Sequence, residues 1–232
     1  MDPILISAIL ALVFVSISTL VGILLIAKYF KSKDKTLIYV GLAWIIIVEA
    51  WMPSAVNLIY ILATRVSLSY QIRALIGNLF IPLGLILWTL VFTELVFKKY
   101  RKHLLLLFTI VGIVFEILLF YALFTDISLI IIVPSHDLNM NYQPLWMVFQ
   151  VVFSVITLVS GLAFSWKSIK HENPEIKLRG KILFVAFISF LIGALLGIID
   201  LPVPGNIIMI TSSIEFYIGY ILPDWIKKRF IK

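Results

Sequence analysis

The sequence contains no cysteine and has few charged residues. Of its 232 residues, 13% are charged and 62% are hydrophobic. The missing cysteine excludes disulfides, thiolate metal sites and cysteine nucleophiles. Because an ordinary soluble domain has about 25% charged residues, this composition also excludes a water-soluble protein.

Sequence motifs of common enzymes are missing as well. There is no HExxH zinc motif, no GxSxG nucleophile motif and no glycine-rich phosphate loop. The last apolar run, residues 206–222, contains no lysine, which excludes a retinal Schiff base there. We therefore expect no enzymatic activity, no cofactor and no bound metal.

Seven apolar runs make up most of the chain, each near the roughly 20 residues that a helix needs to cross about 30 Å of hydrocarbon. They span about residues 4–27, 37–63, 71–97, 104–124, 145–166, 181–200 and 206–222. Lipid offers the backbone no hydrogen-bond partner, so each run is expected to be an α-helix. The connecting loops are too short for a second domain. The sequence thus predicts an all-α membrane protein, a single seven-transmembrane-helix bundle over residues 1–232.

Basic residues alternate in density from one loop to the next. The net charge is +7. The lysines and arginines lie in the loops after the first, third and fifth spans and after the last span, whereas only Arg65 and Arg73 fall on the other side. By the positive-inside rule, the N-terminus is outside the cell membrane and the C-terminus is cytoplasmic. The basic clusters are expected to contact anionic lipid or a cytoplasmic signalling protein rather than nucleic acid. The contact residues expected are Lys170, Lys177, Arg179, Lys227, Lys228 and Arg229.

Three acidic residues, Glu49, Glu116 and Glu215, fall near the middle of predicted spans, where no lysine or arginine lies at matching depth. An ionisable side chain at that depth costs at least about 2.5–3.5 kcal/mol by insertion scales. Polar and aromatic residues at helical spacing accompany these acids. The residues expected to bind a ligand or proton are Glu49, Glu116, Glu215, Asn57, Asn78, Trp51 and Trp88.

Two interpretations of these acids remain open. In one, they line a shared cavity at the midplane that binds a cation, an amine or a proton-linked ligand. In the other, each neutral glutamate is an interhelical hydrogen-bond donor worth roughly 0.6–2 kcal/mol.

Three further features predict local structure. Pro53 and Pro82 are expected to kink their spans. Ser189, Gly193 and Gly197 form a stripe of small residues typical of helix packing. The β-branched run at 127–133 predicts a short strand or hairpin arm over the bundle mouth, or a continuation of the fourth span.

Residues 37–222 also carry a recurring order of motifs. These are Trp44, Glu49 and Trp51; Asn78, Pro82 and Trp88; Phe92-Thr93-Glu94-Leu95; Tyr142-Gln143-Pro144-Leu145-Trp146; and Arg179 in a basic loop. In this order the chain resembles the seven-transmembrane sensor region of prokaryotic histidine kinases and diguanylate cyclases. The resemblance implies sensing of a ligand or of membrane state. Because those regions are fused to an output domain and the sequence ends at Lys232, it also implies a stand-alone sensor acting through a separate partner.

Three functions therefore stay open. The first is a receptor-like sensor that passes a ligand or proton signal to the cytoplasm. The second is a small secondary transporter or channel that uses the same carboxylates. The third is a membrane scaffold or complex subunit without a ligand.

Overall fold

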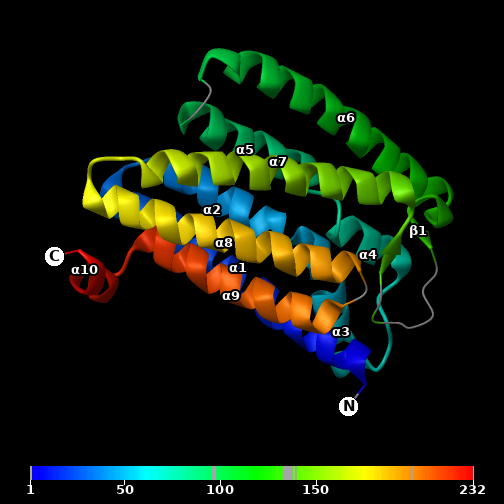
Figure 1. The fold of residues 1–232 in the computed structure, drawn as a ribbon. Helices are drawn as coiled ribbons and strands as arrows, with labels where there is room; N and C mark the ends of the chain where they lie inside the picture. Colours follow the sequence, from blue (N-terminus) through cyan, green and yellow to red (C-terminus); the bar gives the residue numbers. More distant parts are fainter. Residues whose placement is uncertain (1, 96–97, 133–137, 139, 200, 232) are drawn as a thin grey trace.

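The computed structural model describes residues 2–95, 98–132, 138, 140–199 and 201–231, and it is 85% helical (Figure 1). The elements are α1 (Pro3–Ser32), α2 (Thr36–Ile47), η1 (Glu49–Trp51), α3 (Met52–Thr64), α4 (Tyr70–Ile76), α5 (Ile81–Leu95), η2 (Lys98–Tyr100), α6 (Arg101–Thr125), η3 (Ile127–Leu129), β1 (Ile131–Ile132), β2 (Asn141–Tyr142), α7 (Pro144–Ile169), α8 (Pro174–Ile198), α9 (Pro202–Ile221) and α10 (Asp224–Phe230). The predicted all-α class is confirmed.

Among the described residues, six helical segments are long and apolar enough to cross a membrane, and a seventh is added when α9 and α10 count as one bent span. This number is compatible with a multi-pass membrane protein. The sixth span begins at Pro174, seven residues before the predicted start at 181, because Asn173 caps it. The Asn173 side-chain oxygen accepts the backbone N–H groups of Glu175 and Ile176, at 2.8 and 3.4 Å.

Six of the helices in the described part of the chain form a closed ring, and α6 packs outside it. Successive neighbours α1, α2, α5, α7, α8 and α9 pack together, and α9 returns to α1. α6 packs on α5, and Figure 1 shows it at the edge of the bundle. The two chain ends lie at opposite ends of the bundle (Figure 1).

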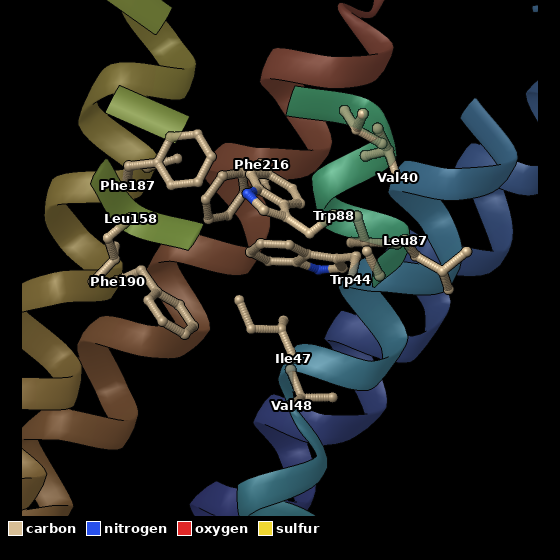
Figure 2. Close-up of a cluster of buried hydrophobic side chains, with 14 of the residues drawn as sticks. Val40, Trp44, Ile47, Val48, Leu87, Trp88, Leu158, Phe187, Phe190 and Phe216 are labelled. Carbon is tan, nitrogen blue, oxygen red and sulfur yellow. The ribbon is translucent and has the colours of Figure 1, made fainter. Parts of the chain in front are cut away.

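An aromatic core fills the centre of the ring (Figure 2). The ring of Trp44 on α2 lies 4.0 Å from that of Phe216 on α9 and 6.2 Å from that of Phe190 on α8. Trp88 on α5 contacts Phe187 of α8 and donates its indole N–H to the Ser160 hydroxyl of α7, at 2.7 Å. These rings come from helices on different sides of the ring and are buried together in one cluster.

A two-stranded hairpin covers one end of the bundle. β1 and β2 pair antiparallel, with Ile131 opposite Tyr142. Ile131 and Tyr142 are buried in a second, smaller core with Phe115 of α6 and Trp146 of α7. Of the alternatives predicted for residues 127–133, the hairpin arm is confirmed at Ile131–Ile132, whereas Ile127–Leu129 form η3. Residues 133–137 and 139 lie outside the described residues.

The small-residue stripe of α8 packs against α9 at one of its two glycines. A Cβ added at Gly193 would lie 2.9 Å from the Gly205 carbonyl oxygen and against Met209, whereas a Cβ at Gly197 would meet nothing within 4 Å. The two glycines thus offer a matched pair of substitutions on one helix.

We predict that Gly193→Ala destabilises the protein by about 1–3 kcal/mol, because the added methyl meets rigid backbone of α9. Gly197→Ala should leave stability unchanged or raise it by up to about 1 kcal/mol, since alanine favours a helix. Thermal unfolding of the purified proteins in detergent measures both. Equal melting temperatures for the two variants would contradict the close approach of α8 and α9.

Candidate ligand-binding site

Glu49 lies at a break in the second span. Pro53 has no N–H to donate to the Glu49 carbonyl, and the chain tightens into the 3₁₀ turn η1, where Met52 donates to that carbonyl instead. The Glu49 side chain is buried, with 1% of its surface exposed. The predicted kink at Pro53 is therefore a 3₁₀ turn between α2 and α3, within a span that runs from Thr36 to Thr64.

The third span breaks beside it, between α4 and α5, just before Pro82. The first N–H groups of a helix have no partner within the helix. Here the backbone N–H of Phe80, next to the start of α5, donates to Glu49 Oε1 at 2.8 Å. One buried carboxyl group thus joins both interruptions.

Buried polar side chains continue from this point toward the hairpin. Asn78 is fully buried, and its amide donates to the Ala74 carbonyl at 2.8 Å. Gln150 of α7 donates to Asn78 Oδ1 at 3.1 Å. The Tyr142 hydroxyl lies beside both amides, and burial raises the pKa of this phenol, so it stays neutral. Together these side chains connect α4, α7 and β2.

Arg73 joins the same network from α4. The pattern of basic residues predicts Arg73 on the outer side of the membrane, and the sequence predicts no basic residue near the acids. In the structure its side chain is fully buried, lies over the Tyr70 ring at 5.6 Å and acts electrostatically on Tyr142. Arg73, Tyr142 and Gln150 were all missed. An arginine inside a predicted apolar run, two residues past its start, was the signal that pointed to Arg73.

Glu116 lies in a groove on the outside of the ring. The groove has a volume of about 600 Å³ and runs between α5 and α6; Pro82, Thr109, Gly112 and Phe120 also line it. Gly112 permits the close approach, because a Cβ there would lie 2.8 Å from the Pro82 Cβ. Glu116 Oε2 is buried and has no hydrogen-bond partner among the described residues. The groove therefore presents a carboxyl group in a wall that is apolar apart from Thr109.

Glu49 and Glu116 approach each other, whereas Glu215 is separate. Glu49 accepts the Phe80 N–H, and Glu116 lines the groove together with Pro82, so both acids lie at the start of α5. Glu215 is on α9, which packs against α8 and α1, while α6 packs on α5 at the other side of the bundle. The aromatic core lies between them. The structure thus does not bring the three predicted acids into one central cavity, because large rings occupy that volume.

The other predicted ligand residues have local structural contacts. Asn57 Oδ1 accepts the Leu68 backbone N–H at 2.8 Å and the Ser67 hydroxyl at 3.1 Å, which fixes the loop after α3. Trp51 packs edge-on against Phe14, with ring centroids 5.4 Å apart. Only Asn78, of these predicted amides and tryptophans, belongs to the network around Glu49 within the described part of the chain.

The basic residues predicted to contact anionic lipid or a cytoplasmic partner have different surroundings in the structure. Arg179 and Lys227 both pair with Glu175, at 2.9 and 3.1 Å, so they are used within the bundle. Lys170 lies 5.0 Å from the centre of the exposed Trp166 ring. The remaining residues, Lys177, Lys228 and Arg229, are exposed.

Comparisons of the chain with protein-family models, curated proteins and solved structures give no match. Function therefore has to be inferred from the site. A carboxyl group in an apolar groove can bind a proton, or a ligand that donates a hydrogen bond or carries positive charge. Glu49, which also lies at the start of α5, can transmit the effect of proton or ligand binding at Glu116 to the start of α5 and to the turn between α2 and α3.

We predict that Glu49→Leu destabilises the protein by about 1–3 kcal/mol, because the buried Phe80 N–H loses its acceptor. Glu49→Gln keeps a carbonyl oxygen at the same place and should cost clearly less. Melting temperatures of the two variants in one detergent test this ranking. If glutamine were as damaging as leucine, the hydrogen bond to Phe80 would not be what Glu49 contributes to stability.

Proposed function

We propose that this protein is a receptor-like sensor in the cell membrane, which passes a ligand or proton signal to a separate cytoplasmic partner. The observation that carries the proposal is the groove between α5 and α6, where Glu116 faces an apolar wall. The outer side chains of α6 are apolar and exposed, which suits lipid. A proton or ligand then reaches Glu116 from within the membrane.

The two interrupted spans are the elements that respond in this proposal. Pro82 lines the groove and lies two residues after Phe80, whose N–H is bonded to Glu49. A change of charge or contact at Glu116 therefore acts on the start of α5. Breaks of this kind absorb changes in backbone angles at low cost, as hinges do. The Trp88–Ser160 hydrogen bond then connects the movement of α5 to α7.

For orientation, we propose an external N-terminus and a cytoplasmic C-terminus. α10 turns by 82° from α9 and carries exposed Trp225 and Phe230 beside exposed Lys228 and Arg229. A short helix with aromatic and basic residues at this angle suits the plane of the membrane surface. Lys170, Lys177, Lys228 and Arg229 are then free to contact anionic lipid or a signalling protein. The resemblance to kinase-linked sensor regions supports the same direction of signalling.

A small secondary transporter is the second candidate. Two interrupted spans that meet at one carboxyl group are typical of transporter sites, where half-helix ends bind ions. The aromatic core argues for the sensor, because buried rings rather than polar groups fill the centre of the ring in the described part of the chain.

The experiment that separates the two uses the proton as the ligand. In lipid nanodiscs, a pH step should change tryptophan fluorescence, and Glu116→Gln should abolish most of that change. Glu94→Gln is the matched control, since Glu94 is an exposed acid paired with Lys98. Liposomes loaded with a pH-sensitive dye should show no Glu116-dependent proton uptake.

Two outcomes would count against the sensor. Proton accumulation that disappears in Glu116→Gln would make the protein a transporter. An unchanged fluorescence response in that variant would remove the groove from the mechanism.

The orientation is tested by cysteine labelling, for which the natural chain provides a cysteine-free background. We predict that Val66→Cys, in the exposed turn after α3, reacts with an impermeant maleimide on intact cells. Glu172→Cys, exposed between α7 and α8, should react only after lysis. The reverse pattern would invert the topology.

A further inference from the structure

A cluster of cations surrounds the end of α9, at the basic end of the bundle. Lys28 of α1 donates to the carbonyls of Tyr220 and Ile221, at 3.1 and 3.2 Å. Arg179 of α8 also donates to the Tyr220 carbonyl. The last carbonyls of a helix lack partners within it and favour positive charge. Two cations from two other helices are therefore held at one point.

Positive charge exceeds negative charge in this cluster. Glu175 accepts from both Arg179 and Lys227. Lys28 is bonded, among the described residues, to carbonyl oxygens alone. Arg179 and Lys227 repel it electrostatically, and Glu175 is the one acid that attracts it among the described residues. An anion that approached Lys28 and Arg179 would relieve this repulsion.

A cavity of about 340 Å³ opens at these two cations. Ser32 and Ser168 add hydroxyl groups to its wall, and Phe164 and Leu183 add apolar surface. This volume is within the range of small-molecule sites. The cavity is thus large enough for a charged headgroup with part of its tail.

One acid, Asp34, also lines this cavity. Its carboxylate accepts the Thr36 backbone N–H at 2.9 Å and so caps the start of α2. Asp34 is therefore engaged in a local turn before α2.

A second cavity of about 170 Å³ adjoins the first. The two share the lining residues Asp34, Leu37, Phe164 and Tyr220. Beyond these, the second cavity is lined mainly by apolar side chains, among them Val40, Trp88 and Val91. A cationic mouth thus leads to an apolar extension between α2, α5 and α7.

We propose that this combined space binds an anionic amphiphile. A phosphate or carboxylate headgroup is held by Lys28 and Arg179, and the adjoining part of its alkyl chain lies against Phe164 and Trp88. The positive charges of Lys28 and Arg179 favour an anion over a cation. The apolar second cavity favours an anion with an alkyl tail over a free anion. This site is distinct from the Glu116 groove and does not depend on the proposed sensor function.

The test uses dodecyl phosphate as the probe, with inorganic phosphate and dodecyltrimethylammonium for comparison, on the full protein in a neutral detergent. Dodecyl phosphate should raise the melting temperature in a saturable way, because it binds the folded state. The two comparison compounds should not. Lys28→Gln and Arg179→Gln should each weaken the apparent affinity at least tenfold. Lys177→Gln is the matched control, since Lys177 is an exposed cation on the same helix as Arg179.

A second measurement locates the tail and does not depend on these variants folding. A dodecyl phosphate brominated along its chain should quench tryptophan fluorescence with a saturable component, and Trp88→Phe should remove that component. The proposal is overturned if inorganic phosphate stabilises equally, which would mean a free-anion site. It is also overturned if Lys177→Gln weakens binding as much as Lys28→Gln, or if quenching persists in Trp88→Phe.

Discussion

The constraint on which this structure depends is that backbone groups within lipid need partners inside the protein. Pro53 and Pro82 interrupt two adjacent spans, and each interruption leaves a helix end near the middle of the bundle. Glu49 satisfies one of those ends through the Phe80 N–H. The free-energy cost of burying the Glu49 carboxyl group is thus offset by the hydrogen bond that it accepts from a buried backbone N–H. The hydrogen bond between Glu49 and Phe80 lies at the start of α5, where the polar network of Asn78 and the groove of Glu116 meet.

The aromatic core decides where a ligand site is possible. Trp44, Phe190 and Phe216 meet at the centre of the ring (Figure 2), so polar groups cannot gather there. α6 lies outside the ring and covers α5 incompletely, which leaves the groove. A site of this kind is approached sideways from the surrounding medium rather than through an axial opening. That geometry favours detection of something within the membrane over passage across it.

Sequence patterns predicted the all-α class, the long apolar helices, the hairpin arm and the disturbance at both prolines, because each depends on local chemistry. They also identified Glu49, Glu116 and Asn78 as polar residues within apolar runs. They did not predict that Glu215 would be separated from the other acids, since helical spacing gives the face of a residue and not the neighbour of its helix. Arg73 and Gln150 were missed for the same reason: their importance comes from a contact between distant segments.

The two candidate sites have opposite charge and lie at different depths, yet both involve α5. Pro82 lines the acidic groove, and Trp88, on the same helix, lines the apolar extension of the cationic cavity. A rigid helix that is held at its start by Glu49 cannot shift at one of these places without moving at the other. If ligands at both sites favour the same position of α5, each raises the affinity of the protein for the other by the same factor. Binding of an anionic amphiphile in the cationic cavity would then change the affinity of the groove for its proton or ligand. In this way, the response proposed for Glu116 would depend on the composition of the membrane.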